Sequence, residues 1–187
     1  MSFEPTPITL LYLVGVGLFA GTVNTIAGGG SLITLPALIF FGMPAAMANA
    51  TNRIGGFVQS ATAAGEFHRL GVLDIGSTLR LLPPAVIGAI LGSFIAVDID
   101  EALFQRVIGG VMLLMLGVVL LKPKRWLEGQ SSESPSSSGW QQWLGFFAVV
   151  LYGGFLQAGV GIFILAALVL LIDKHLVQAN AMKSLLI

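Results

Sequence analysis

A group of hydrogen-bonding residues and glycines interrupts a strongly apolar stretch near the N-terminus. It lies between residues 10–20 and 32–41 and consists of Asn24, Thr25, Gly28, Gly29, Gly30 and Ser31. Each glycine costs a helix interior about 1 kcal/mol relative to alanine. We therefore expect the helix to break here, with non-helical backbone at all three glycines. A helix that restarts at Ser31 would present free backbone N–H groups and the positive end of its dipole, which together favour an anion.

A second polar group follows on the next predicted helix, residues 45–67. Asn49, Asn52 and Arg53 are three and four positions apart, so they share one helical face. A cation inside a membrane costs about 2.5–3.5 kcal/mol, which makes it a candidate functional residue. If the Arg53 guanidinium faces the pocket of the broken helix, its planar paired donors would suit the oxygens of an anion. The alternatives are that Arg53 reaches the membrane interface and that the asparagines only join helices.

The same pattern returns near the C-terminus. Ala179-Asn180-Ala181-Met182-Lys183 resembles residues 48–53, and Asn180 lies 131 positions after Asn49. Gln157 precedes Asn180 by 23 positions and Asn24 precedes Asn49 by 25, so the copies match with a two-residue gap. Glycine-interrupted segments at corresponding places in two halves point to a transporter binding site. The predicted substrate-binding residues are Asn24, Thr25, Gly28, Gly29, Gly30, Ser31, Asn49, Asn52, Arg53, Gln157, Asn180 and Lys183.

Composition places this site in a helical membrane protein. The 187 residues are 56% hydrophobic and 10% charged, against about 25% charged residues in soluble domains. The apolar runs lack the period-two alternation of a membrane barrel. Zero net charge without a basic tract argues against nucleic acid as a partner. With no cysteine, and no metal-ligand or Ser-His-Asp pattern, we expect neither an enzyme nor a cofactor.

The predicted fold is all-α and polytopic, with two homologous repeats. Each repeat opens with a glycine-broken or re-entrant helix, here residues 8–41 and 140–172, followed by a polar-faced helix. Spans at 79–97, with Pro83 and Pro84 in its first turns, and at 102–121 complete the first repeat. The expected divisions are 1–122, a Ser-rich linker at 123–139, and a second repeat from 140 that ends partway through its second element at Ile187. No basic region precedes the first helix, so we expect the N-terminus to be retained.

Loop charges predict the orientation in the membrane. Two spans separate Arg69 and Arg80 from the basic residues Lys122, Lys124 and Arg125, which places both groups on one side. The acidic residues Asp98, Asp100 and Glu101 lie on the other side. Basic loops stay cytoplasmic, so the linker is expected in the cytoplasm. If the first element crosses once, the N-terminus is cytoplasmic and the repeats are parallel; if it crosses twice, the N-terminus is outside.

The segments VNTIAGGGSLITLPAL, ANATNR and QANAMKSLL resemble the sulfite exporter TauE/SafE family of bacterial membrane permeases. The resemblance implies a multi-pass, two-repeat permease of the inner membrane that moves sulfite, sulfoacetate or related small anions across the bilayer. It also implies further hydrophobic elements after the point where this chain ends. The alternative interpretation is a channel or scaffold subunit without coupled transport. The oligomeric state stays open.

Overall fold

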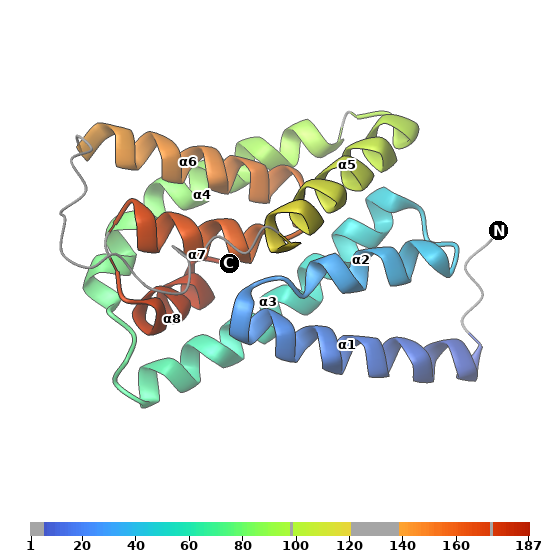
Figure 1. Ribbon diagram of the computed structural model, residues 1–187, viewed down its shortest axis with the longest axis horizontal. Coiled ribbons are helices and arrows are strands. Elements are labelled where there is room, and N and C mark those ends of the chain that lie inside the picture. The colour runs from blue at the N-terminus through green and yellow to red at the C-terminus, as the bar shows by residue number, and fades with distance from the viewer. Residues whose placement is uncertain (1–5, 98, 121–138, 173) are drawn as a thin grey trace.

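The computed structural model describes residues 6–97, 99–120, 139–172 and 174–187 (Figure 1). These residues form eight α-helices and contain no strand, which confirms the all-α prediction. Most of the predicted linker, residues 123–138, lies outside the described residues, as do Asp98, Lys122, Lys124 and Arg125.

The first long element is a helical hairpin. α1 (Pro7–Ala27) starts at the N-cap Thr6 and ends at Gly28, whose φ of 78° is left-handed. α2 (Ser31–Phe40) then returns toward the start of α1, and the Tyr12 and Phe41 rings meet with centroids 5.3 Å apart. The predicted break is confirmed, and the two ends of the element lie at the same end of the molecule. Gly30 departs from the expectation, because its φ of −58° and ψ of −36° are already helical.

Two long helices follow the hairpin. α3 (Ala45–Arg69) carries the polar face, and α4 (Ile75–Val97) packs mainly against α6 (Gly139–Phe155). α4 starts earlier than the sequence predicted, because Asp74 accepts the Ser77 N–H at 3.0 Å and caps the first turn. Pro83 and Pro84 therefore lie inside the helix, and their predicted place in the first turns is wrong.

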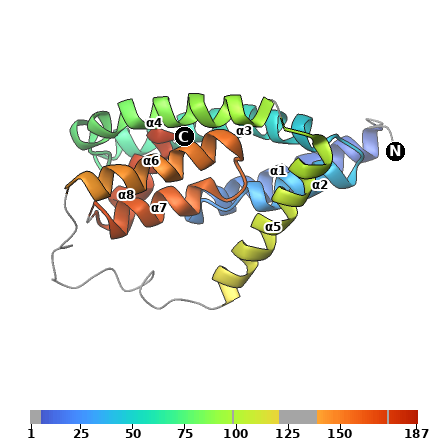
Figure 2. The same ribbon diagram turned by 90° about the horizontal axis from the view of Figure 1, so that it is seen from above.

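α5 (Glu101–Leu120) is fixed to the start of α3 at the end of the molecule near the N-terminus (Figure 2). The Glu101 carboxylate accepts the Ala45 N–H at 2.6 Å. Phe104 and Ile108 on the next turns are buried in a core with Leu35 of α2. This packing joins α5 to the outer end of the first hairpin.

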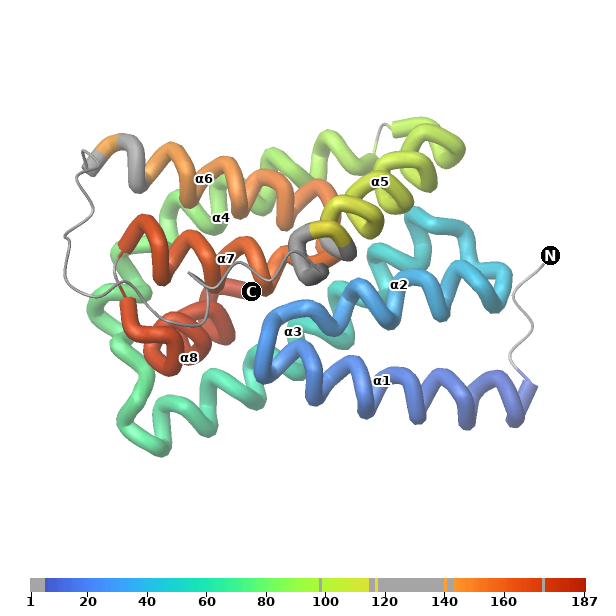
Figure 3. Tube along the Cα trace, in the orientation of Figure 1, coloured from blue at the N-terminus to red at the C-terminus, as the bar shows by residue number. Residues whose placement is uncertain are grey.

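A second hairpin forms from α6 (Gly139–Phe155) and α7 (Val160–Leu170), and α8 (Leu176–Leu186) follows it (Figure 3). Glycines allow α4 and α6 to approach at backbone distance: a Cβ on Gly92 would lie 2.1 Å from the Leu151 carbonyl oxygen, and one on Gly154 would lie 2.3 Å from that of Ala89. Small residues are typical of such close helix contacts in membranes.

α1 and α4 are long and apolar enough to cross a membrane, with 21 and 23 residues. Large apolar side chains of α1, among them Ile8, Leu11 and Leu18, are exposed. Exposed apolar surface of this extent predicts contact with lipid rather than with water.

Candidate functional site

The tips of the two hairpins meet at the centre of the molecule, as Figure 1 shows from their opposite directions. We call Gly28–Gly30 the first break and residues 156–159 the second break. A Cβ on Gly28 would lie 2.4 Å from the Gly161 carbonyl carbon, so only glycine fits there. The Ser31 hydroxyl donates to the Gln157 carbonyl at 2.9 Å and accepts the Gly159 N–H at 2.8 Å. One side chain at the start of α2 thus joins the two breaks.

α3 caps the C-terminal end of α6. The Arg53 guanidinium donates to the carbonyls of Gly154 and Phe155, the second at 3.3 Å. Asn49, which is buried, donates to the Phe155 carbonyl at 3.5 Å and accepts the Gln157 N–H at 3.2 Å. The last carbonyls of a helix lack intrahelical donors and carry partial negative charge. The predicted polar face therefore satisfies the second break.

α8 caps the C-terminal end of α1 in the same way. The Asn180 amide donates to the Thr25 carbonyl at 2.8 Å, and the Lys183 ammonium donates to the Asn24 carbonyl at 3.0 Å. Lys183 is only 2% exposed. The pair on α3, which follows the first hairpin, thus caps a helix of the second hairpin. The pair on α8, which follows the second hairpin, caps a helix of the first.

A left-handed glycine lies in each break, but at a different place in the two turns. Gly28, with a φ of 78°, is the C-cap of α1, whereas Gly159, with a φ of 69°, is the N-cap of α7. The two glycines are 131 positions apart, the same spacing as Asn49 and Asn180. The equivalence of Gln157 with Asn24 stays a prediction.

A polar cavity of about 220 Å³, which we call the first cavity, lies between α1, α2, α3 and the second break. A single water needs about 10–15 Å³, so the cavity has room for a small solute. Its polar lining residues are Asn24, Ser31, Thr34, Asn52, Gln59 and Gln157. They form a network: Asn24 donates to Gln59 at 2.9 Å, Asn52 donates to Gln157 at 3.2 Å, and Thr34 donates to Asn52 at 2.5 Å.

A second cavity of about 220 Å³ adjoins the second break and contains Arg53. Gln157 lines both cavities. The expectation that Arg53 faces the pocket of the first break is wrong, because the carbonyls at the end of α6 draw its guanidinium to the second break. The guanidinium has five N–H donors, of which the Nη2 group makes the two bonds to the helix end.

The first break offers fewer free backbone donors than the sequence suggested. The Gly30 N–H is bound by the Asn24 side chain at 3.3 Å, and the Leu32 and Ile33 N–H groups bond to the carbonyls of Gly29 and Gly30. Hydrogen bonds within the turn thus occupy these backbone N–H groups. Side-chain amides must supply most of the donors for a solute.

The structure divides eleven of the predicted site residues into two groups, and the twelfth, Arg53, lines the second cavity. Those lining the first cavity are Asn24, Gly30, Ser31, Asn52 and Gln157. Those engaged mainly in helix ends and turns are Thr25, Gly28, Gly29, Asn49, Asn180 and Lys183. Thr34 and Gln59 were missed. Thr34 lies three positions after Ser31, and Gln59 is a polar residue on the helix that carries Asn52 and Arg53, which are usable signals. Among the described residues, no group of three metal-ligating side chains occurs.

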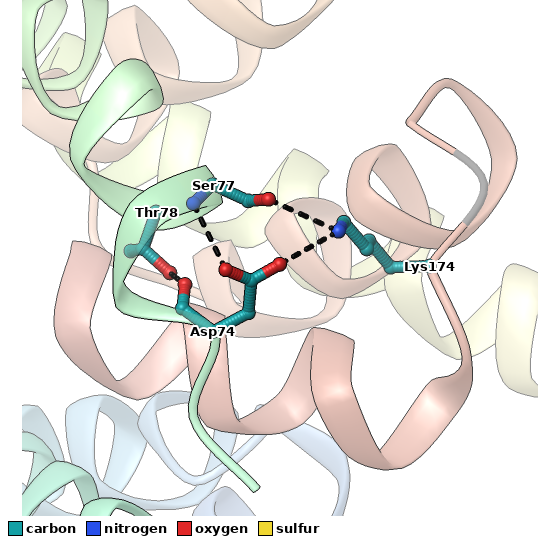
Figure 4. Close-up of polar contacts among 4 residues, drawn as sticks. All are labelled: Asp74, Ser77, Thr78 and Lys174. Carbon is teal, nitrogen blue, oxygen red and sulfur yellow. Dashed lines mark hydrogen bonds and ion pairs between the residues drawn. The ribbon is translucent and has the colours of Figure 1, made fainter.

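An ion pair lies away from the cavities, where the turn before α4 meets the turn before α8 (Figure 4). The Lys174 ammonium is 2.9 Å from the Asp74 carboxylate and 3.2 Å from the Ser77 hydroxyl. Hydrogen bonds from Ser77 and the neighbouring Lys174 hold the pKa of Asp74 well below its ordinary value of 3.8. This contact joins the start of α4 to the turn before α8.

Residues 13–187 match the family described as Sulfite exporter TauE/SafE. A "Probable membrane transporter protein" of Haemophilus influenzae is 32% identical over 182 residues, covering 92% of this chain and 67% of the relative. The "Probable membrane transporter protein YfcA" of Escherichia coli K12 is 28% identical over 191 residues, covering 98% of this chain and 68% of the relative. This chain thus spans about two thirds of the length of both relatives. No solved structure matched.

Proposed function

Because the chain belongs to the sulfite exporter TauE/SafE family and is a membrane transporter, we propose that it is a permease for small anions of the bacterial inner membrane. The proposed substrates are sulfite and organosulfonates such as sulfoacetate. The observation that carries the proposal is the first cavity, which lies where two broken helices meet inside an otherwise apolar helical protein. Broken helices near the bilayer midplane are the usual binding sites of secondary transporters.

The substrate contacts would come from the groups that line the two cavities. Gln157 reaches both, and a Cβ on Gly56 would lie 2.8 Å from its amide nitrogen, so this donor points across the first cavity toward α3. Arg53 brings a full positive charge to the second cavity. A sulfonate or sulfite would then exchange its water for the Gln157 and Asn52 amides and the free donors of the guanidinium. The helix-capping residues Asn49, Asn180 and Lys183 would hold this geometry rather than touch the solute.

We further infer that the two hairpins are inverted repeats. Each break contains a left-handed glycine, and the hairpins point in opposite directions (Figure 2). In this arrangement the N-terminus and the Asp100 side lie outside, and the Arg69 and Arg80 side lies in the cytoplasm. A cysteine introduced between Ser131 and Ser138 should resist an impermeant thiol reagent in intact cells. Strong labelling would reverse the orientation.

Flux measurements test the transport proposal. The full-length gene product, reconstituted in liposomes, should move radiolabelled sulfite or sulfoacetate faster than protein-free liposomes, and a proton gradient should drive uphill accumulation. Arg53→Gln at equal protein density is the matched control. Flux that only follows the anion gradient would support the alternative, a channel. Absence of any anion flux from well-folded protein would contradict the proposal and support a scaffold role.

A further inference from the structure

Lys183 is a buried cation, and none of the carboxylates that the structure describes is paired with it. Among the described residues the ion pairs are Arg69 with Glu66 and Lys174 with Asp74, neither of which reaches the helix breaks. Lys183 is 2% exposed, and its recorded acceptor is the Asn24 carbonyl at 3.0 Å. The negative end of the α1 dipole is therefore the main group that offsets its charge.

Oxygen atoms gather where Lys183 meets the end of α1. The Asn24 and Thr25 carbonyls are held by Lys183 and Asn180, and the Asn180 side-chain oxygen is buried without a hydrogen-bond partner. In broken-helix transporters, unwound carbonyls and the C-terminal ends of half-helices coordinate the coupling cation. Here the Lys183 ammonium lies at such a helix end.

The end of α6 has the same arrangement with a different cation. Arg53 donates to the Gly154 and Phe155 carbonyls, and Asn49 lies beside it as Asn180 lies beside Lys183. A cation thus lies at the C-terminal end of each of these helices: Lys183 of α8 at the end of α1, and Arg53 of α3 at the end of α6.

We propose that Lys183 and Arg53 are built-in cations that stand in for bound Na⁺ at the two breaks. The chain consequently folds and works without Na⁺ there, and removal of Lys183 opens a cation site at the end of α1. The proposal rests on the proposed transport function only where it concerns the coupling of transport to a cation. The site itself can be tested without any substrate.

The test is thermal unfolding of the full-length protein in detergent, in NaCl and in choline chloride of equal ionic strength. The wild-type midpoint should be the same in both salts. Lys183→Ala should unfold earlier in choline, and Na⁺ at ten times its Kd should raise the midpoint by roughly 3–6 °C. Lys183→Ser, which keeps an oxygen ligand, should respond in the same direction. Lys174→Ala removes a cation from a turn and should show no difference between the salts.

A wild-type midpoint that rises in NaCl would overturn the proposal without reference to any variant. Lys183→Ala and Lys183→Ser midpoints that are equal in NaCl and choline would also overturn it. Sulfite flux measured on the same wild-type preparation keeps the two questions apart. Loss of flux with an unchanged salt response contradicts the transport proposal alone.

Discussion

The first break and the second break each contain a left-handed glycine but differ in backbone and in chemistry. Gly28, with φ 78°, ends α1, whereas Gly159, with φ 69°, is the N-cap of α7. Asn24, beside the first break, binds the Gly30 N–H within its own hairpin as well as Gln59 of α3. The carbonyls at the end of α6 bind side chains of α3, and Ser31 of α2 binds the Gln157 carbonyl at the second break.

The cations at the two breaks differ in their exposure to solvent. Lys183 at the first break is sealed from solvent, whereas Arg53 at the second is partly exposed and lines a cavity. A sealed cation holds structure, and an open one can meet a solute. We therefore expect the first break to hold the shape of the site and the second break to recognise the charge of the solute.

The largest effect is expected at the contact between the breaks. Gly28→Val places a β-branched side chain at positive φ, against the Gly161 backbone. Left-handed backbone and overpacking together should cost about 2–5 kcal/mol. Little folded protein should elute in fluorescence-detected size-exclusion chromatography. Gly15→Ala in the same helix, where a Cβ meets nothing within 4 Å, is the control and should elute as wild type.

Substitutions at Arg53 should separate the effect of its charge on transport from the effect of its planar shape. Arg53→Lys keeps the charge but loses the planar fork, so it should transport with weakened apparent affinity. Arg53→Gln should lose at least tenfold in kcat/KM, because a charged hydrogen bond contributes about 1.5–3 kcal/mol. Flux kinetics at matched membrane abundance measure both. Unchanged kinetics in Arg53→Gln would make Arg53 a capping residue only, and the second break would lose its assigned role.

Gln157 should show an intermediate effect, because it serves both cavities. Gln157→Leu removes the acceptor of Asn52 and an amide donor facing α3. The apparent KM for sulfite should rise about 5- to 10-fold, as expected for one lost hydrogen bond of about 1 kcal/mol, with a smaller change in kcat. Gln105→Leu on the exposed face of α5 is the matched control. Equal behaviour of the two variants would argue against a substrate role for Gln157.

The smallest effect is expected at the Asp74 ion pair, whose side chains are 36% and 21% exposed. The folded-state pKa of Asp74 lies below the ordinary value of 3.8, so the stabilisation is present above about pH 4 and is lost as pH falls further. Asp74→Asn should lower the unfolding midpoint slightly at pH 7, and the difference from wild type should shrink below pH 4. A difference independent of pH down to pH 2 would contradict this.

Sequence reasoning identified the fold class, the first break and the polar face of α3, because glycine runs and polar faces are local signals. It did not place Arg53 correctly, since its partners are carbonyls about a hundred positions away and backbone acceptors leave no mark in the sequence. Gln157 was matched to Asn24 by side-chain type, and in the structure Asn24 lies inside α1 whereas Gln157 lies in the turn between α6 and α7. Gln59 was visible as a polar residue, but its bond to Asn24 depends on how α1 packs on α3.

The central claim is that the solute binds between the two breaks, and cysteine protection tests it directly. The chain has no cysteine. Gly55 lines the first cavity and a Cβ there meets nothing within 4 Å; Gly65 on the same helix is equally open but lies outside the cavity. A water-soluble thiol reagent should label Gly55→Cys more slowly as sulfoacetate is added, with saturation, while Gly65→Cys should be unaffected. Sulfoacetate is used because sulfite itself attacks thiol reagents. Equal labelling of Gly55→Cys with and without sulfoacetate would contradict the account.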